Sequence, residues 1–248
     1  MNDIYNSLAI VLRTFDAGEY DLFFSVLTRD FGKLKCTARG IKKMSSKNVY
    51  SLTVGSLVDL YFLAKKNASS YLVTGAKIDW KPDYLKNSFT KNKLLFSGIQ
   101  LIDQLTLDEG VFDQDNFWEF DYLFNYLMEI NRAKSYKKAL IYHIYFVLKI
   151  LDHYGFKPEF KKCIACSKSL KDKKIYYSFR DGAFVCENCL FSDFKNTQIK
   201  EFPFSALKAA NFFMNNKAEV IYKLKLDKNI LKALLEIVTL HKRYCLGF

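Results

Sequence analysis

Hydrophobic and polar residues alternate through much of the first 80 residues. The runs richest in β-branched and aromatic residues are residues 7–15, 20–28, 33–41, 57–64 and 70–78. Runs of this length and composition predict five β-strands. The third run is the clearest, because Leu34, Cys36 and Ala38 share one face while the residues between them are polar or cationic. Such alternation predicts a strand with one face in a core and the other in solvent.

A segment rich in Lys and Ser, residues 42–56, separates the third and fourth predicted strands. Five short strands with an insertion at this point predict a small barrel that looks like an OB-fold. We therefore expect residues 1–80 to form an OB-fold domain that binds nucleic acid.

After Trp80 the hydrophobic period changes from two residues to about 3.6, which indicates helices. Stripes at residues 94–105 and 117–127 predict two helices, and a third is expected at residues 136–153, stopped by Gly155 and Pro158. Residues 205–215 and 228–244 are again helical in pattern, with Asp227 as N-cap of the last. The sequence thus predicts an α+β multidomain protein with a helical domain at residues 81–248.

Four cysteines form two Cys-x-x-Cys pairs, Cys163 with Cys166 and Cys186 with Cys189. This spacing is typical of a zinc ribbon, in which four thiolates surround one ion and leave no open position. Residues 171–185 resemble a short hairpin that turns at Asp181-Gly182 and brings the pairs together. We expect one structural Zn²⁺ in a ribbon at residues 160–191, interrupting the helical domain.

Other uses of these cysteines are two disulfides, a redox pair or unrelated core positions. The first residues lack the basic and apolar regions of a secretory signal, so a cytoplasmic location is expected and disulfides are disfavoured. Cys36 and Cys245 stand alone and are interpreted as ordinary core or surface residues.

The chain has 248 residues, half of them hydrophobic, and a formal net charge of +12. No apolar run approaches the roughly 20 residues that cross a bilayer. The charge favours an anionic partner such as nucleic acid, although a general excess of solvated lysines is the alternative.

The positive charge is concentrated in places. Residues 31–58 contain no acidic residue, so one local surface must be positive. Strand alternation groups Lys33, Lys35 and Arg39 on one face, and these are the first candidates for contacts with DNA phosphates. Further candidates are the loop cations and one residue at the end of the first strand: Lys42, Lys43, Lys47 and Arg13.

Aromatic side chains near this face would add stacking on bases, and the candidates are Phe31, Tyr50 and Tyr61, each of which is equally compatible with a core position. A second acid-free stretch, residues 131–151, predicts either an extended DNA track or a dock for an acidic partner. Its cations are Arg132, Lys134, Lys137, Lys138 and Lys149.

Catalytic motifs are missing from the sequence. It has no phosphate-binding Gly-x4-Gly-Lys-Ser/Thr loop, no His-x-Glu of a zinc deaminase and no His-Glu-x-x-His. His143, His153 and His241 are scattered and are interpreted as packing or surface residues. The rivals to a DNA-binding role are a zinc-ribbon enzyme acting on nucleic acid, with carboxylates that converge only in the fold, and an adaptor that binds protein alone.

At this point the sequence resembles the bacterial DNA repair and recombination mediator family RecO along nearly its whole length. The N-terminal part of the likeness consists of Ile10-Val-Leu-Arg13, Gly18-Glu-Tyr-Asp21, Leu27-Thr28, Gly32-Lys33 and Ala38-Arg-Gly40. In the second domain, Leu151, Gly155, Pro158 and the four cysteines around Gly182 resemble the zinc-bearing branch. Ser167 and Ala183 stand where the family often has Gly, and residues 80–132 match weakly.

The resemblance implies a protein that is not an enzyme. It implies binding of single- and double-stranded DNA without sequence preference, annealing of complementary strands and, with RecR, help in loading RecA onto DNA coated by single-strand-binding protein. It also makes the acidic C-terminal tail of single-strand-binding protein an expected ligand of the second acid-free stretch, and it implies association with the nucleoid.

Overall fold

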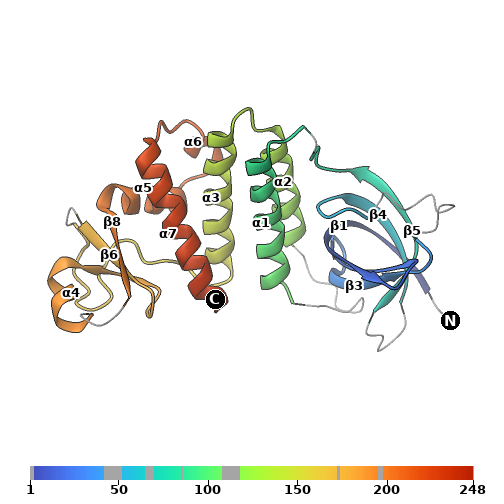
Figure 1. Cartoon of the computed structure of the whole chain (residues 1–248), viewed down its shortest axis with the longest axis horizontal. Helices are drawn as coiled ribbons and strands as arrows, with labels where there is room; N and C mark the ends of the chain where they lie inside the picture. Colours follow the sequence, from blue (N-terminus) through green and yellow to red (C-terminus); the bar gives the residue numbers. More distant parts are fainter. Residues whose placement is uncertain are drawn as a thin grey trace. The chain divides into compact units, whose positions relative to one another are not determined.

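The computed structural model describes residues 3–41, 52–64, 70–84, 86–107, 118–171, 174–194 and 198–247. Two compact units make up the chain, Met1–Tyr136 and Lys137–Phe248. Figure 1 shows that strands dominate the beginning of the chain and helices the rest. Within the described ranges, no helix combines the length and the apolar character needed to span a membrane.

The first unit contains a closed five-stranded barrel (Figure 1). Its strands are β1 (Asp3–Ala17), β2 (Asp21–Thr28), β3 (Gly32–Ala38), β4 (Leu57–Ala64) and β5 (Tyr71–Trp80). They follow the order β1-β2-β3-β5-β4, and β4 pairs back with β1 to close the barrel. Only the β3–β5 pair is parallel among these five strands. This arrangement confirms the predicted OB-fold barrel.

The barrel core consists of the inward residues of every strand, with Phe62 at its centre. The Phe62 ring contacts the rings of Tyr5, Phe31 and Tyr71 at centroid distances of 5.8 to 6.0 Å. On β3, Leu34, Cys36 and Ala38 are buried, as alternation predicted. The polar face of β3 is therefore the outer surface of the barrel.

Two helices, α1 (Phe89–Leu105) and α2 (Trp118–Arg132), belong to the same compact unit as the barrel. They pack closely, because the missing side chain of Gly98 leaves room for the buried ring of Tyr126. The Tyr84 hydroxyl donates to the Val54 carbonyl at 2.5 Å and connects the segment before α1 to the barrel. The change of hydrophobic period near residue 80 thus lies inside a compact unit.

The second unit is built on helices α3 (Tyr136–His153), α5 (Phe204–Asn215), α6 (Ala218–Ile221) and α7 (Lys228–Leu246). The predicted end of α3 is confirmed: Gly155 has φ +81° and its N–H donates to Asp152 O, while Phe156 N–H donates to Leu151 O. These are the two hydrogen bonds of a Schellman motif. The predicted cap of α7 is also confirmed, since the Asp227 carboxylate accepts from Asn229 N.

A small lobe follows α3 along the chain. It contains β6 (Lys174–Ser178), β7 (Ala183–Cys186), α4 (Glu187–Asp193) and β8 (Ile199–Pro203). The predicted hairpin is present as β6 and β7, and β8 adds a third strand beside β6. The sequence analysis missed β8, because Ile199-Lys-Glu-Phe-Pro203 is short and buries only Phe202.

Candidate nucleic-acid interface and metal centre

Lys33 and Lys35 lie on β3 and Arg39 directly follows its last residue, and the environments of these three cations differ. Lys35 and Arg39 are exposed. Lys33 is only 11% exposed. Lys42, Lys43 and Lys47, predicted as further DNA contacts, lie outside the described residues, as does Tyr50.

Lys33 is tied to helix α1. Its ammonium lies 3.0 Å from Asp103 Oδ1 and donates to the carbonyls of Asp103 and Thr106 at 2.7 and 3.3 Å. Those carbonyls belong to the end of α1, whose last turn has no basic residue of its own. A cation at this place stabilises the partial negative charge at a helix C-terminus. Lys33 therefore holds α1 on the barrel, which sequence alternation could not reveal.

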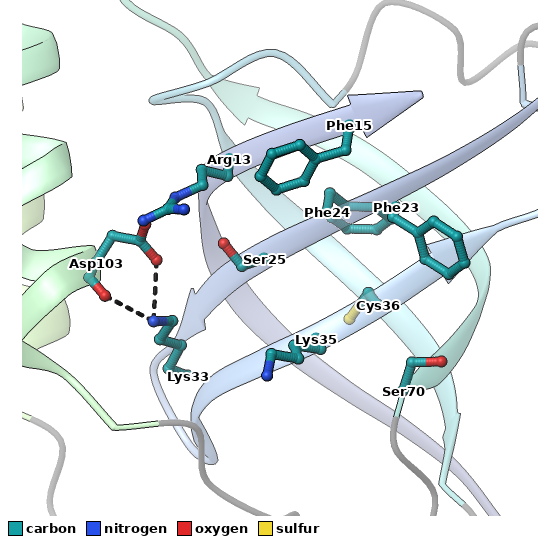
Figure 2. Close-up of a pocket in the computed structure, with 10 residues that line it drawn as sticks. All are labelled: Arg13, Phe15, Phe23, Phe24, Ser25, Lys33, Lys35, Cys36, Ser70 and Asp103. Atoms are coloured by element: carbon teal, nitrogen blue, oxygen red, sulfur yellow. Dashed lines mark hydrogen bonds and ion pairs between the residues drawn. The ribbon is translucent and has the colours of Figure 1, made fainter. Parts of the chain in front are cut away.

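Arg13 shares the same acid. Its Nε donates to Asp103 Oδ2, and Figure 2 shows Arg13 and Lys33 converging on the Asp103 carboxylate. The Asp103 side chain is 2% exposed, whereas that of Arg13 is 49% exposed. One buried carboxylate thus faces two cations, and a net positive charge remains on the outer edge of the barrel.

Two aromatic candidates for base stacking, Phe31 and Tyr61, differ in exposure. Phe31 is 6% exposed and its ring packs in the barrel core, so of the two positions left open for this residue the core position is confirmed. Tyr61 is 41% exposed; its hydroxyl donates to Asp59 at 2.9 Å and its ring covers Gly75 on the neighbouring strand.

Two exposed phenylalanines on this surface were not predicted from the sequence as candidates for base stacking. Phe15 and Phe23 face each other across the β1–β2 ladder and are 55% and 48% exposed. They line a pocket of about 500 Å³ with Arg13 and Lys35. A signal was available, because consecutive strand residues point to opposite faces and only one of Phe23 and Phe24 could enter the core. Phe24, 3% exposed, takes the core position.

The four cysteines of the two pairs gather at one point. All four sulfur atoms lie within 4.8 Å of one another, with Cys166 Sγ and Cys186 Sγ 3.9 Å apart. A tetrahedral ion at 2.3 Å from each sulfur needs separations of about 3.8 Å. The cluster can therefore hold a metal ion, as the sequence predicted.

Backbone geometry prepares this cluster for thiolates. Burial raises the pKa of the Cys163 thiol, but N–H groups of Cys166, Cys186 and Ala165 outweigh burial and bring that pKa to about 7. Burial raises the pKa values of Cys186 and Cys189; Cys163 and Cys166 add to both rises, while hydrogen bonds with Cys189 partly oppose the rise at Cys186. Thiolates so close together require a bound cation to ionise together.

The first knuckle turns at Ser167, which adopts φ +58° in the left-handed region. Its N–H donates to the Cys163 carbonyl at 2.9 Å. Glycine takes this conformation without steric cost, whereas a residue with a side chain adopts it less readily. Serine keeps the turn, and all four sulfur atoms stay together.

The second acid-free stretch divides into two parts. Arg132, Lys134, Lys137 and Lys138 are exposed at the beginning of α3 and just before it. Lys149 lies about three turns further along α3 and donates to Met214 O at 2.6 Å. The cations before and at the start of α3 are thus exposed, and Lys137 among them donates to the Leu226 carbonyl at 2.9 Å.

The three histidines match their expected packing and surface roles. His143 is buried on α3, His153 is exposed, and His241 is buried with ring nitrogens 3.1 and 3.0 Å from the carbonyls of Gly182 and Phe156. Within the described ranges, the cysteine quartet is the one cluster of ligand-type side chains suited to a metal.

Comparison with known proteins shows to which family the chain belongs. The family described as recombination protein O, N terminal, matches residues 1–79, and recombination protein O, C terminal, matches residues 91–247. The chain belongs to the RecO family.

Curated RecO relatives extend over most of the chain. A DNA repair protein RecO of Mesoplasma florum is 31% identical over 222 residues, 88% of this chain and 77% of the relative. The RecO protein of Dehalococcoides mccartyi strain CBDB1 is 26% identical over 231 residues, 93% and 86% of the two chains. That of Chloroherpeton thalassium is 24% identical over 247 residues, 97% and 92% of the two chains. A role in DNA repair and recombination follows for this RecO chain.

Proposed function

We propose that this chain is a recombination mediator that binds single- and double-stranded DNA without sequence preference and performs no catalysis. Residues 1–80 form its nucleic-acid-binding domain. The observation that carries the proposal is the exposure of Lys35 and Arg39 on the outer face of the OB-fold barrel of a RecO-family chain. Exposed cations neutralise phosphates and release counterions, which gives affinity independent of base sequence.

The same surface accounts for strand annealing. Two complementary strands repel each other as polyanions, and a cationic face that holds one strand lowers this repulsion for the second. Arg13 contributes at the edge of the face, and Lys42, Lys43 and Lys47, which lie outside the described residues, are proposed as further phosphate contacts. Lys33 adds charge from a position tied to Asp103.

The partners follow from the family role. With RecR, the protein helps RecA load onto DNA coated by single-strand-binding protein in the cytoplasm, at the nucleoid. The exposed Lys137 and Lys138 at the start of α3 are the dock for the acidic C-terminal tail of single-strand-binding protein, since clustered cations attract acidic peptides. The metal of the cysteine cluster is one structural Zn²⁺, because thiolate ligands in tetrahedral geometry favour zinc.

The decisive experiment is the salt dependence of DNA binding. Lys35→Glu with Arg39→Glu should weaken binding of single strands and duplexes and reduce the slope of log affinity against log salt by about two. Lys228→Glu with Lys232→Glu, exposed on α7, is a control with the same change in net charge. An unchanged slope in the barrel variant would remove the proposed DNA face.

A second assay tests the mediator role itself. The wild-type protein should speed annealing of complementary strands coated with their single-strand-binding protein and leave both strands chemically intact in Mg²⁺. Cleaved or modified strands would replace the mediator with an enzyme. A protein that binds its partner proteins but neither single strands nor duplexes would be an adaptor.

A further inference from the structure

The pocket beside Arg13 on the outer face of the barrel has a chemistry that phosphate binding does not explain. Figure 2 shows Phe15 and Phe23 on neighbouring strands, with Ser25 and Lys35 beside them. The pocket measures about 500 Å³. Two half-exposed rings in register across a ladder, flanked by cations, form an apolar surface that a solvent-facing barrel wall does not need.

Ser25 gives the pocket an unfilled hydrogen-bonding group. Its side chain lines the pocket, the residue is 8% exposed, and its hydroxyl has no hydrogen-bond partner among the residues that the structure describes. Buried hydroxyls nearly always have a partner, and an orphan in a native structure indicates a missing ligand or water. Ser25 lines the pocket between its strand partners Arg13 and Lys35.

We propose that this pocket receives an unpaired base of single-stranded DNA and gives the barrel a preference for single strands over duplexes. The inference rests on the proposed function and deepens it. The base stacks on Phe15 or Phe23 and hydrogen-bonds the Ser25 hydroxyl, while Arg13 and Lys35 take the flanking phosphates. In a duplex the base faces are stacked on each other, so only the phosphate contacts remain.

The charge and the aromatic lining of the pocket together indicate which molecule it binds. Both rings are exposed, the cations Arg13, Lys33 and Lys35 line the pocket with them, and the acid among its lining residues, the buried Asp103, is paired with Lys33 and Arg13. A neutral apolar ligand would not need those cations, and inorganic phosphate would not need the rings. An unpaired nucleotide uses both.

The test compares three fluorescent DNA probes on the full-length protein: a 15-nucleotide thymidine strand, the same strand with abasic sites at its centre, and a duplex of equal length. Wild type should bind the thymidine strand about 5- to 140-fold more tightly than the abasic strand, the range expected for stacking. Phe15→Leu with Phe23→Leu keeps an apolar surface without aromatic faces and should abolish this difference, leaving duplex affinity within about twofold.

Phe89→Leu is the matched control, because it removes another exposed ring from the same compact unit outside the pocket. It should preserve the preference for the thymidine strand. Duplex binding of every variant also verifies that the barrel is folded. Equal loss of single-strand and duplex binding, or an unchanged preference, in Phe15→Leu with Phe23→Leu would overturn the pocket. Duplex binding insensitive to Lys35→Glu would instead overturn the proposed function.

Ser25→Ala supplies an independent readout. Removing an orphan hydroxyl should leave the free protein as stable as wild type or more stable, while binding of the thymidine strand weakens about 3- to 10-fold. A merely structural serine would instead lower stability and leave the ratio of thymidine to abasic binding unchanged, which would remove Ser25 from the proposed site.

Discussion

Substituting Lys33 tests whether this lysine fastens helix α1 to the barrel. Lys33→Met keeps the apolar stem but removes an ammonium that makes one ion pair with Asp103 and two hydrogen bonds to carbonyls. Breaking a buried ion pair typically costs about 3–5 kcal/mol. Asp103 retains Arg13 as a partner, so we expect the lower loss of about 2–4 kcal/mol in the first unit.

The two tryptophans allow this unit to be followed alone. Trp80 and Trp118 both belong to Met1–Tyr136, so tryptophan fluorescence reports its unfolding without signal from the second unit. With a typical urea dependence of about 2 kcal/mol per molar, the Lys33→Met midpoint should fall by about 1–2 M.

Lys35→Met, two residues along the same face, is the matched control and should cost less than about 0.5 kcal/mol. Asp103→Asn should destabilise the unit at least as much as Lys33→Met, and the double variant should lose less than the sum of the two. Equal midpoints for Lys33→Met and Lys35→Met would refute the fastening role of Lys33.

Two further predictions concern the second unit. Removing the metal with a chelator, or by Cys163→Ser, should increase hydrogen exchange in β6 and β7 while duplex DNA binding by the barrel persists; loss of DNA binding as complete as in Lys35→Glu with Arg39→Glu would contradict the assigned DNA face. Burial, with Lys242 nearby, lowers the pKa of His143 to about 3. The folded state therefore favours the neutral ring, whereas the unfolded chain protonates His143 below pH ~6.5. The stability of the folded state should fall by about 1.4 kcal/mol for each pH unit below that value. Hydrogen exchange of α3 at pH 7.5 and 5.5 should therefore depend on pH more steeply in wild type than in His143→Leu, and parallel dependences would refute this account.

The sequence predicted those features that depend on neighbouring residues. Alternation placed Leu34 and Cys36 in the core and Lys35 outside, and two short cysteine spacings predicted a cluster that needs only one hairpin to close. Local patterns carry this information, because side-chain direction follows the period of the backbone.

Features that depend on distant partners could not be predicted in this way. Alternation correctly turned Lys33 away from the core, but its acid comes from a helix 70 residues later in the sequence. Likewise, the pair Phe23-Phe24 guarantees one outward ring, yet its opposition to Phe15 depends on the β1–β2 register, which a bulge between Val11 and Arg13 shifts.

The ion pairs of Arg13 and Lys33 with Asp103 matter for any attempt to study the barrel in isolation. A fragment ending at residue 80 would lack α1, and both cations would lose their carboxylate. Because Arg13 already contributes to the DNA face of the intact protein, such a fragment would gain at most one phosphate contact, from Lys33, and its salt slope would be steeper than that of the whole protein by up to about one. DNA affinities measured on the isolated barrel would therefore exceed those of the intact chain. A fragment that spans the compact unit Met1–Tyr136 keeps α1 and with it the native charge of this surface.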